Sequence, residues 1–233
     1  MIDRILLRRA ATYLLSGLVV FILAGIFHAE GGDPNNHVPT FTAYANSSTW
    51  TLVHLGQFFG IFVTVMGLLA LYYAVRPTLT AQTLLGRFAA TAAVIALTLY
   101  GALQAVDGVA LKQAVNAWAG ASEADKAMRF AVAEGVRWTE WGLRSYHSFM
   151  FGIALVLFAL LIPRLGKKFA MVGYLMAVTG LAYLVQGWVL GTEGFSANNS
   201  IPTLVGYASW IIWSIWLLAA SWNVKEAPAV RSA

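Results

Sequence analysis

The sequence predicts an all-α membrane protein, a single polytopic domain of six transmembrane helices over residues 1–233. Hydrophobic residues make up 59% of the chain and charged residues only 11%, and the mean hydropathy is +0.70. This is far more apolar than one soluble core requires. The chain also contains six apolar runs of the length, about 20 residues, that crosses a hydrocarbon core of roughly 30 Å as a helix. Short basic blocks flank these runs, as in membrane proteins.

The six predicted spans are distributed over the whole chain. The first follows a basic segment, MIDRILLRR, but it is too long for the core of a signal peptide and is followed by no small-residue cleavage site, so we interpret it as a retained anchor. Most basic residues fall in the segments on the side of the N-terminus, and the positive-inside rule therefore predicts that both termini are cytoplasmic. The spans lie near 10–28, 51–75, 88–111, 146–163, 169–191 and 203–222.

Composition excludes several classes of function. The chain has no cysteine, which excludes disulfides, iron–sulfur clusters and covalently attached c-type haem. The net charge of +5 comes from the basic blocks beside the spans, where they set topology. We therefore expect the lipid bilayer, and no nucleic acid, as a partner.

Between the third and fourth spans lies the one long connection. Ser122 and Asp125, in SEAD, match the start of a helix, and apolar residues then recur at helical spacing. This pattern predicts an amphipathic helix on the outer membrane surface. A bend near Gly135 or Gly142 is then needed before the chain enters the membrane.

Two segments of the chain are nearly the same. EGGDPNNHVPTFTAYA, residues 30–45, and EGFSANNSIPTLVGYA, residues 193–208, share Glu, Gly, two Asn, Pro, Thr, Tyr and Ala at equivalent positions. Each follows an outbound span, so a duplication would be a parallel repeat. Chance similarity between two helix entrances explains the match equally well. The first copy continues through NSST, which predicts a short additional helix before the second span.

Polar side chains form a layer in the outer third of four predicted spans. They are spaced by three, four or seven residues, so each set shares one helix face. Ionisable groups inside a membrane are costly and mark either a structural network or a functional site. The sets are His54 with Gln57; Tyr100, Gln104 and Asp107; Glu140, Arg144 and His147; and Tyr183 with Gln186.

One interpretation of this layer is purely structural. Asp107 pairs with Arg144, and Glu140 lies one turn away on the same helix as that arginine. Interhelical polar contacts of this kind are ordinary in membranes.

The other interpretation is a cofactor site. His54 and His147 enter from the same side at similar depth, as the axial ligands of haem b or two ligands of a transition metal would. With Asp107 and Glu140 they form a possible metal-binding set. The polar side chains Gln57, Gln104, Arg144 and Gln186 would then help to bind the cofactor. The pattern does not decide between haem and a bare metal, and it assigns no catalytic residue.

Other candidate residues lie outside this layer. His28 and His37 flank Glu30 and Asp33 in an outer loop, where a weak metal site is possible but solvated histidines are expected. Trp210, Trp213 and Trp216 lie too deep in the sixth span to be only an interfacial belt. They are expected to pack internally or to face another membrane subunit, lipid or pigment.

Residues 151–187, FGIALVLFALLIPRLGKKFAMVGYLMAVTGLAYLVQG, resemble a family of uncharacterised six-helix bacterial membrane proteins. The features shared are a histidine at the start of the fourth helix, matched here by His147, a Leu-Ile-Pro-Arg end to that helix, and a glycine-containing fifth helix. The resemblance covers about the C-terminal third of the chain. It implies a bacterial cytoplasmic membrane location and six spans, but no activity.

The function predicted from these observations is an inner-membrane protein with an outward-facing His/carboxylate site that binds haem b or a metal, for redox or small-ligand chemistry. One alternative is a non-catalytic subunit of a larger respiratory or photosynthetic complex. A second is a small-solute transporter, which the scarcity of ionisable side chains in the inner halves of the spans disfavours. Whether the chain is an enzyme stays open.

Overall fold

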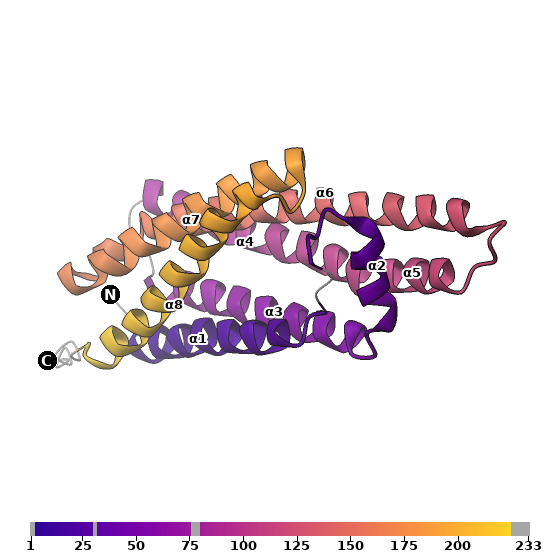
Figure 1. Ribbon diagram of the computed structural model, residues 1–233. Coiled ribbons are helices and arrows are strands. Elements are labelled where there is room, and N and C mark those ends of the chain that lie inside the picture. Colours follow the sequence, from indigo (N-terminus) through magenta and orange to yellow (C-terminus); the bar gives the residue numbers. More distant parts are fainter. Residues whose placement is uncertain (1–2, 30–31, 76–79, 225–233) are drawn as a thin grey trace, which may run out of the picture.

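The computed structural model describes residues 3–29, 32–75 and 80–224, and regular structure in them is entirely helical (Figure 1). The all-α prediction is confirmed for this part of the chain. The elements are α1 (Arg4–Ile26), α2 (His37–Asn46), α3 (Trp50–Val75), α4 (Thr80–Ala105), the π-helical segment η1 (Val106–Leu111), α5 (Lys112–Ala119), α6 (Lys126–Ala159), η2 (Ile162–Leu165), α7 (Lys167–Glu193), η3 (Ala197–Asn199) and α8 (Ser200–Trp222).

Six helical segments in the described residues are long and apolar enough to cross a membrane. They agree with the six predicted spans, and they indicate a multi-pass membrane protein. Two are longer than expected: α4, η1 and α5 run on without a break, and α6 is followed by η2 after a turn at Leu160 and Leu161. The segments are Arg4–Ile26, Trp50–Val75, Thr83–Ala119, Lys126–Leu165, Lys167–Glu193 and Ala197–Trp222.

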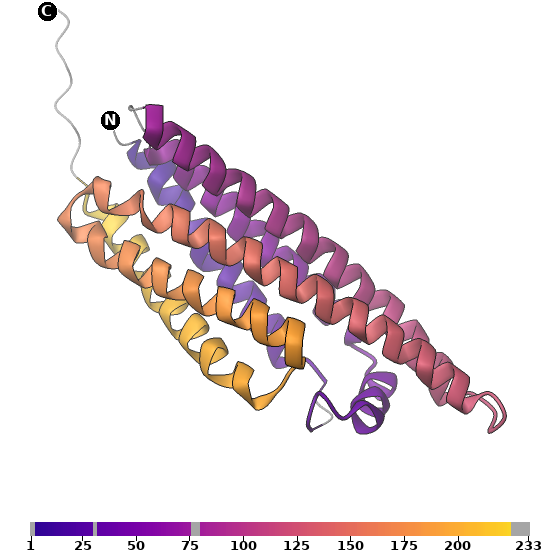
Figure 2. The same ribbon diagram turned by 90° about the horizontal axis from the view of Figure 1, so that it is seen from above.

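The long helices form one bundle (Figures 1 and 2). Helix α1 packs along α3, α6 packs along both α4 and α7, and α8 packs against α7 and more sparsely against α1. The start of α1 and the end of α8 lie at the same end of the bundle, where the Arg8 guanidinium donates to the Trp222 carbonyl at 3.2 Å and lies 4.5 Å from its ring. From that end α1 and α8 diverge.

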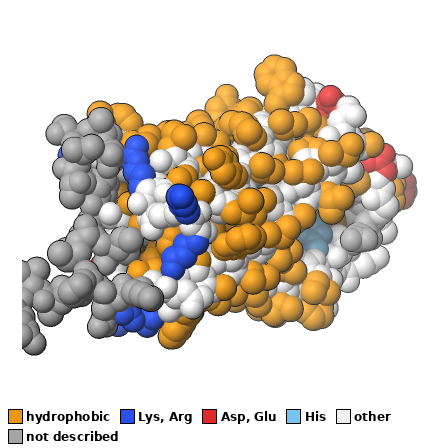
Figure 3. Space-filling model, turned by 90° about the vertical axis from the view of Figure 1, so that its left-hand side faces the viewer, with side chains coloured by type: hydrophobic (Ala, Val, Ile, Leu, Met, Phe, Trp, Pro, Cys, Tyr) orange, Lys and Arg blue, Asp and Glu red, His pale blue; other side chains and the backbone are white. Residues whose placement is uncertain are grey.

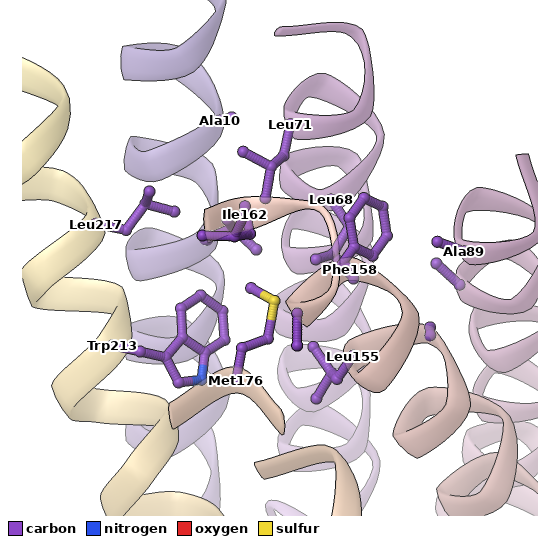
Figure 4. Packing of buried hydrophobic residues seen from close by; sticks show 14 of the residues in the cluster. Ala10, Leu68, Leu71, Ala89, Leu155, Phe158, Ile162, Met176, Trp213 and Leu217 are labelled. Atoms are coloured by element: carbon purple, nitrogen blue, oxygen red, sulfur yellow. The ribbon is translucent and has the colours of Figure 1, made fainter. Parts of the chain in front are cut away.

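Helices in this bundle approach closely where small residues face each other. A Cβ added to Gly152 on α6 would lie 2.7 Å from the Gly180 carbonyl oxygen, and a Cβ on Gly180 would lie 2.8 Å from the Gly152 carbonyl oxygen. Only glycine at both positions permits this contact, as in many transmembrane helix pairs. The core between the helices is filled by Leu, Phe and Ala side chains, as Figure 4 shows around Leu155, Phe158 and Ile162.

The tryptophans of α8 belong mostly to this core. Trp210 and Trp213 are fully buried, and the Trp213 indole donates to Thr179 Oγ1 at 3.1 Å. Internal packing, one of the two outcomes expected for these residues, therefore holds for both. They cannot contact another subunit, and of the three only Trp216 is exposed.

The expected surface helix with a bend near Gly135 or Gly142 is wrong. Helix α6 is continuous from Lys126 to Ala159, and with α5 it forms a hairpin that extends the bundle at the end opposite the start of α1 (Figures 1 and 2). Most of the apolar positions that suggested a membrane surface are exposed, among them Met128, Val132 and Trp138. A residue on another face of α6, Ala133, packs into a second small core under α2. This core contains Phe41, Tyr44, Trp50, Leu111, Val115, Trp118 and Ala133. We call residues 112–136 the hairpin extension.

The two similar segments begin helices at equivalent positions. Helix α2 starts at His37 and α8 at Ser200, each seven residues after the start of its copy, and Pro39 and Pro202 are the third residues of these helices. Helix α2 ends after ten residues, which confirms the short helix expected before the second span, whereas α8 crosses the bundle. Glu30 and Gly31 lie outside the described residues, and the repeat stays a prediction.

Candidate functional site

A face of α6 carries three charged side chains at a spacing of three and four residues. Glu140 is fully buried and accepts hydrogen bonds from both arginines, from Arg137 Nη1 at 2.8 Å and from Arg144 Nε at 3.0 Å. Because each oxygen of the carboxylate has its own guanidinium partner, the three side chains hold one another in a fixed geometry.

Asp107 connects this face to α3. Its Oδ2 lies 3.6 Å from Arg144 Nη2 and 3.1 Å from His54 Nε2. The other ring nitrogen of His54, Nδ1, donates to the Trp50 carbonyl at 2.7 Å. The charged groups therefore form a chain from α6 through η1 to α3. We call His54, Asp107, Arg137, Glu140 and Arg144 the polar cluster.

The π-helical segment η1 places Asp107 in this cluster. A wider turn changes the pairing of backbone carbonyls, and two of them are used by α3: Trp50 Nε1 donates to the Asp107 carbonyl at 2.8 Å, and Thr51 Oγ1 donates to the Gly108 carbonyl at 2.9 Å. A Cβ on Gly108 would lie 2.6 Å from the Cβ of His54, so a glycine is required for this approach. Single π turns inside helices occur frequently at functional sites.

A cavity of about 570 Å³ lies against the polar cluster, between α1 and α8. Its apolar wall comes from the two diverging helices, and Ile26 and Ile211, which are 68% and 37% exposed, mark its opening at the side of the bundle. Its polar wall comes from α2, α3, η1, α6 and the segment after α1. The polar lining residues are His28, Tyr44, Gln57, Asp107, Arg137 and Arg144.

His28 lies at the rim of this cavity and is not a solvated loop histidine, contrary to expectation. Its ring centroid is 4.9 Å from that of Trp50 and 5.3 Å from that of His54, and its Nδ1 donates to the Ala29 carbonyl at 2.9 Å. Burial, and then the neighbouring His54, lower the pKa of His28 to about 4. Burial also raises the pKa of Tyr44 to about 12. Both groups are therefore uncharged at neutral pH.

The other loop histidine is also engaged. His37 Nδ1 lies 2.8 Å from Glu134 Oε1, and the His37 side chain is only 9% exposed. The segment after α7 closes over the same region: Asn35 Nδ2 donates to the Glu193 carbonyl at 2.9 Å, and the Phe195 N–H donates to Asn35 Oδ1 at 2.8 Å. We call this double contact the Asn35 clasp.

Phe195, which the clasp holds, covers the cluster. The centre of its ring lies 5.0 Å from the guanidinium carbon of Arg137 and 5.3 Å from that of Arg144. A cation over an aromatic face is stabilised most where water is excluded. The clasp thus fixes a lid residue of the cavity through two hydrogen bonds.

His147 lies in a different environment from His54. Its Nδ1 donates to the Ala96 carbonyl at 2.9 Å, and its ring packs against Tyr100 and Phe151. It lines a smaller cavity of about 170 Å³, with Tyr100, Arg144, Tyr183, Gln186 and Tyr207, whereas His54 lines a cavity of about 310 Å³ on the other side of η1 with Thr51, Gln104 and Gly108. The structure does not bring the two imidazoles into one cavity.

The polar cluster fits neither haem nor a bare metal well. His54 Nδ1 donates to the Trp50 carbonyl, and its Nε2 faces Asp107 Oδ2 at 3.1 Å, so a carboxylate occupies the position from which iron would approach Nε2. No group of three or more His, Asp and Glu side chains in the described residues could hold a metal ion. Binding of haem b or a transition metal stays a prediction, and the geometry does not favour it.

The remaining sequence candidates divide between the cavities. Gln57 lines the large cavity, Gln104 the one beside His54, and Gln186 the one beside His147. Sequence reasoning did not assign Arg137, His28, Tyr44 or Phe195 to the site. The spacing of Arg137, Glu140 and Arg144 on one helix face was a signal that could have found the first of these.

Comparisons with protein-family models, curated proteins and solved structures found no match. The fold and the site place the chain in a broad class, the polytopic helical membrane proteins. Its distinguishing feature is a buried cluster of paired charges beside a cavity between α1 and α8.

Proposed function

We propose that the chain is a multi-pass protein of the bacterial cytoplasmic membrane, with both termini in the cytoplasm and the polar cluster in the outer leaflet. The distribution of charge supports this orientation. An apolar surface separates a zone of lysine and arginine side chains from acidic ones (Figure 3). The basic residues at the α1 end include Arg4, Arg8, Arg9, Arg164, Lys167 and Lys168. Positive charge of this kind remains on the cytoplasmic side.

The function that the site supports best is the binding of a small amphipathic molecule that enters from the bilayer. The observation that carries this proposal is the large cavity, because it opens between α1 and α8 on the lipid-facing side of the bundle and ends at guanidinium and carboxylate groups. Ligand sites of about 300–1,000 Å³ with an apolar wall and a few placed polar groups are typical of small-molecule binding. An apolar part of the molecule would lie along α1 and α8 and its polar head against the cluster.

A second candidate function is structural. Glu140 pairs with Arg137 and Arg144, and Asp107 lies against Arg144 and His54, so the cluster joins α3, η1 and α6 without any ligand. A protein whose cluster serves only this purpose fits a non-catalytic subunit of a larger assembly.

Orientation is tested by cysteine labelling, since the chain has no native cysteine. A membrane-impermeant maleimide added to intact spheroplasts should label Ser122→Cys, in the turn of the hairpin extension, and should label Lys167→Cys only after lysis. The reverse pattern would overturn the proposed topology.

Ligand binding is tested with a variant that fills the cavity. Gly25 lines it, and a Cβ there would meet only Gln57 Nε2, at 3.7 Å, so a Gly25→Leu side chain would occupy ligand space. Gly135→Leu is the matched control, because nothing lies within 4 Å of a Cβ at Gly135. Native mass spectrometry should show a bound small molecule with wild type and Gly135→Leu but not with Gly25→Leu. No adduct in wild type, or equal adducts in all three, would favour the structural role.

A further inference from the structure

Among the residues that line the large cavity, two have a buried polar side-chain atom without a hydrogen-bond partner. The atoms are Oδ1 of Asp107, a residue that is 1% exposed, and Nε of Arg137, a residue that is 3% exposed. Both residues line the cavity. An acceptor and a donor left unpaired away from water are unfavourable, so they indicate a ligand group that donates to one and accepts from the other. A hydroxyl does both.

The charge of the site restricts the ligand further. Two guanidinium groups, Arg137 and Arg144, are balanced by two carboxylates, Asp107 and Glu140, and His28 beside them is uncharged at neutral pH. An anionic head such as a phosphate would add a buried charge without a free cation to pair with it. The ligand head is therefore expected to be neutral.

The walls of the cavity indicate the shape of the ligand. Phe21 and Tyr207 face each other across α1 and α8 with ring centroids 6.1 Å apart, and Phe195 closes the region near the arginines. Aromatic side chains of this kind pack well against a flat ring. Ile22, Ile26 and Ile211 continue the wall toward the opening, where an apolar chain can extend into lipid.

We propose that the large cavity binds a quinol, that is, a neutral aromatic ring with two hydroxyl groups and an apolar tail. One hydroxyl donates to Asp107 Oδ1 and accepts from Arg137 Nε–H. The second hydroxyl donates to Nε2 of His28, which can accept because Nδ1 of the same ring donates to the Ala29 carbonyl. The ring lies among the aromatic side chains, and the tail leaves between Ile26 and Ile211. This inference rests on the proposed binding of an amphipathic molecule and names its class.

The oxidised form of the same molecule is the sharpest comparison. A quinone has carbonyl oxygens that accept hydrogen bonds but no hydroxyl that donates, so Asp107 Oδ1 would stay unpaired when it binds. The site is therefore expected to prefer the quinol by about tenfold or more.

The experiment uses the purified full chain in detergent micelles without oxygen. Binding of decylubiquinol, decylubiquinone and decyl phosphate is followed by quenching of tryptophan fluorescence, with thermal stabilisation as a second measurement. We expect tight binding of the quinol, weaker binding of the quinone and none of the phosphate. If no probe binds, the proposed function fails as well. If the quinone or the phosphate binds as tightly as the quinol, only the quinol inference fails.

Two variants test the contacts. Asp107→Asn replaces an acceptor by a side chain that can also donate, so the preference for quinol over quinone should fall to about one. Arg137→Lys keeps the positive charge but removes the Nε–H, and quinol affinity should fall about tenfold. Arg129→Lys, at an exposed position of the hairpin extension, is the control and should behave as wild type. A folded Asp107→Asn or Arg137→Lys protein with unchanged preference and affinity would overturn the inference.

Discussion

Nε2 of His54 lies 3.1 Å from Oδ2 of Asp107, and both side chains are 99% buried. This contact joins α3 to the π-helical segment and, through Arg144, to α6. Burying so many ionisable groups is costly unless each is paired, so their network is expected to respond strongly to the loss of one partner.

Glu140→Gln should destabilise the protein more than any exposed charge substitution. Removing this fully buried carboxylate leaves Arg137 and Arg144 without their shared counter-ion, and breaking a buried pair costs about 3–5 kcal/mol. Unfolding by heat or by SDS in mixed micelles measures the loss. Glu123→Gln, at an exposed turn, is the control and should stay within about 0.5 kcal/mol of wild type. Equal stability of the two variants would contradict the pairing described here.

Gly108→Ala should destabilise the protein, because its new methyl group would lie 2.6 Å from the Cβ of His54 and would push α3 from η1. Overpacking of this kind costs about 1–3 kcal/mol. Gly135→Ala makes the same chemical change where no atom lies within 4 Å, and it should stabilise α6 by about 0.5–1 kcal/mol. Unfolding midpoints that shift in the same direction for both variants would show that the contact with His54 is not tight.

Stability should fall below pH 6.5 in a way that depends on His28. Burial lowers its pKa from 6.5 to about 4, so the unfolded chain takes up a proton at a higher pH than the folded chain does. The stability contributed by the neutral ring is therefore complete above pH 6.5, falls between pH 6.5 and 4, and levels off below. The charged or titratable neighbours of the ring include His54, Asp107, Arg144 and Tyr44, and the pKa of Tyr44, about 12, keeps it neutral over this range.

His28→Phe keeps an aromatic ring beside Trp50 but cannot be protonated. The difference in unfolding temperature between wild type and His28→Phe, measured from pH 8 to pH 4.5, should change in favour of the variant as the pH decreases. A difference that is the same at every pH would refute the role of His28.

Asn35→Ala should loosen the segment that carries Phe195. The substitution removes both hydrogen bonds of the clasp, each worth about 0.5–1.5 kcal/mol. Amide hydrogen exchange in residues 193–199 should become faster while exchange in α3 and α6 stays unchanged. Asn116→Ala, at an exposed position of α5, is the control. Unchanged exchange at Phe195 would mean that other contacts hold the lid.

The six helical spans could be predicted because hydropathy and length reflect the requirement to cross lipid, and each predicted run overlaps one long helical segment, the first extending two residues past Ile26. The end of the bundle at the hairpin extension could not be predicted. The helical spacing of apolar residues in 126–141 suggested the face that contains Met128, Val132 and Trp138, which is exposed, whereas the contact with α2 and α5 is made through Ala133 on another face.

The candidate site could be predicted only in part. His54 lies beside Asp107, whereas His147 contacts the Ala96 carbonyl, which is about 16 Å earlier along the same helix, so the two histidines differ in depth and line separate cavities. Helix neighbours and rotations are set by packing, which the sequence alone does not give. The pairing of Asp107 with Arg144, which the structural interpretation expected, is present at 3.6 Å. No sequence pattern predicted the π turn that positions Asp107.

The single wider turn at η1 also determines which way the side chains of α5, the next part of the helix, point. A π turn holds one residue more than an α turn, so the part of the helix after Leu111 is rotated by about 100° relative to an uninterrupted α-helix. The Lys112 ammonium reaches the carbonyl oxygens of Tyr44, Ala45 and Ser47 at the end of α2 only in this phase. The extra residue of the π turn therefore lets one continuous helix pack against two partners. Helix α4, before the turn, packs against α6, and Lys112, after it, bonds to the end of α2.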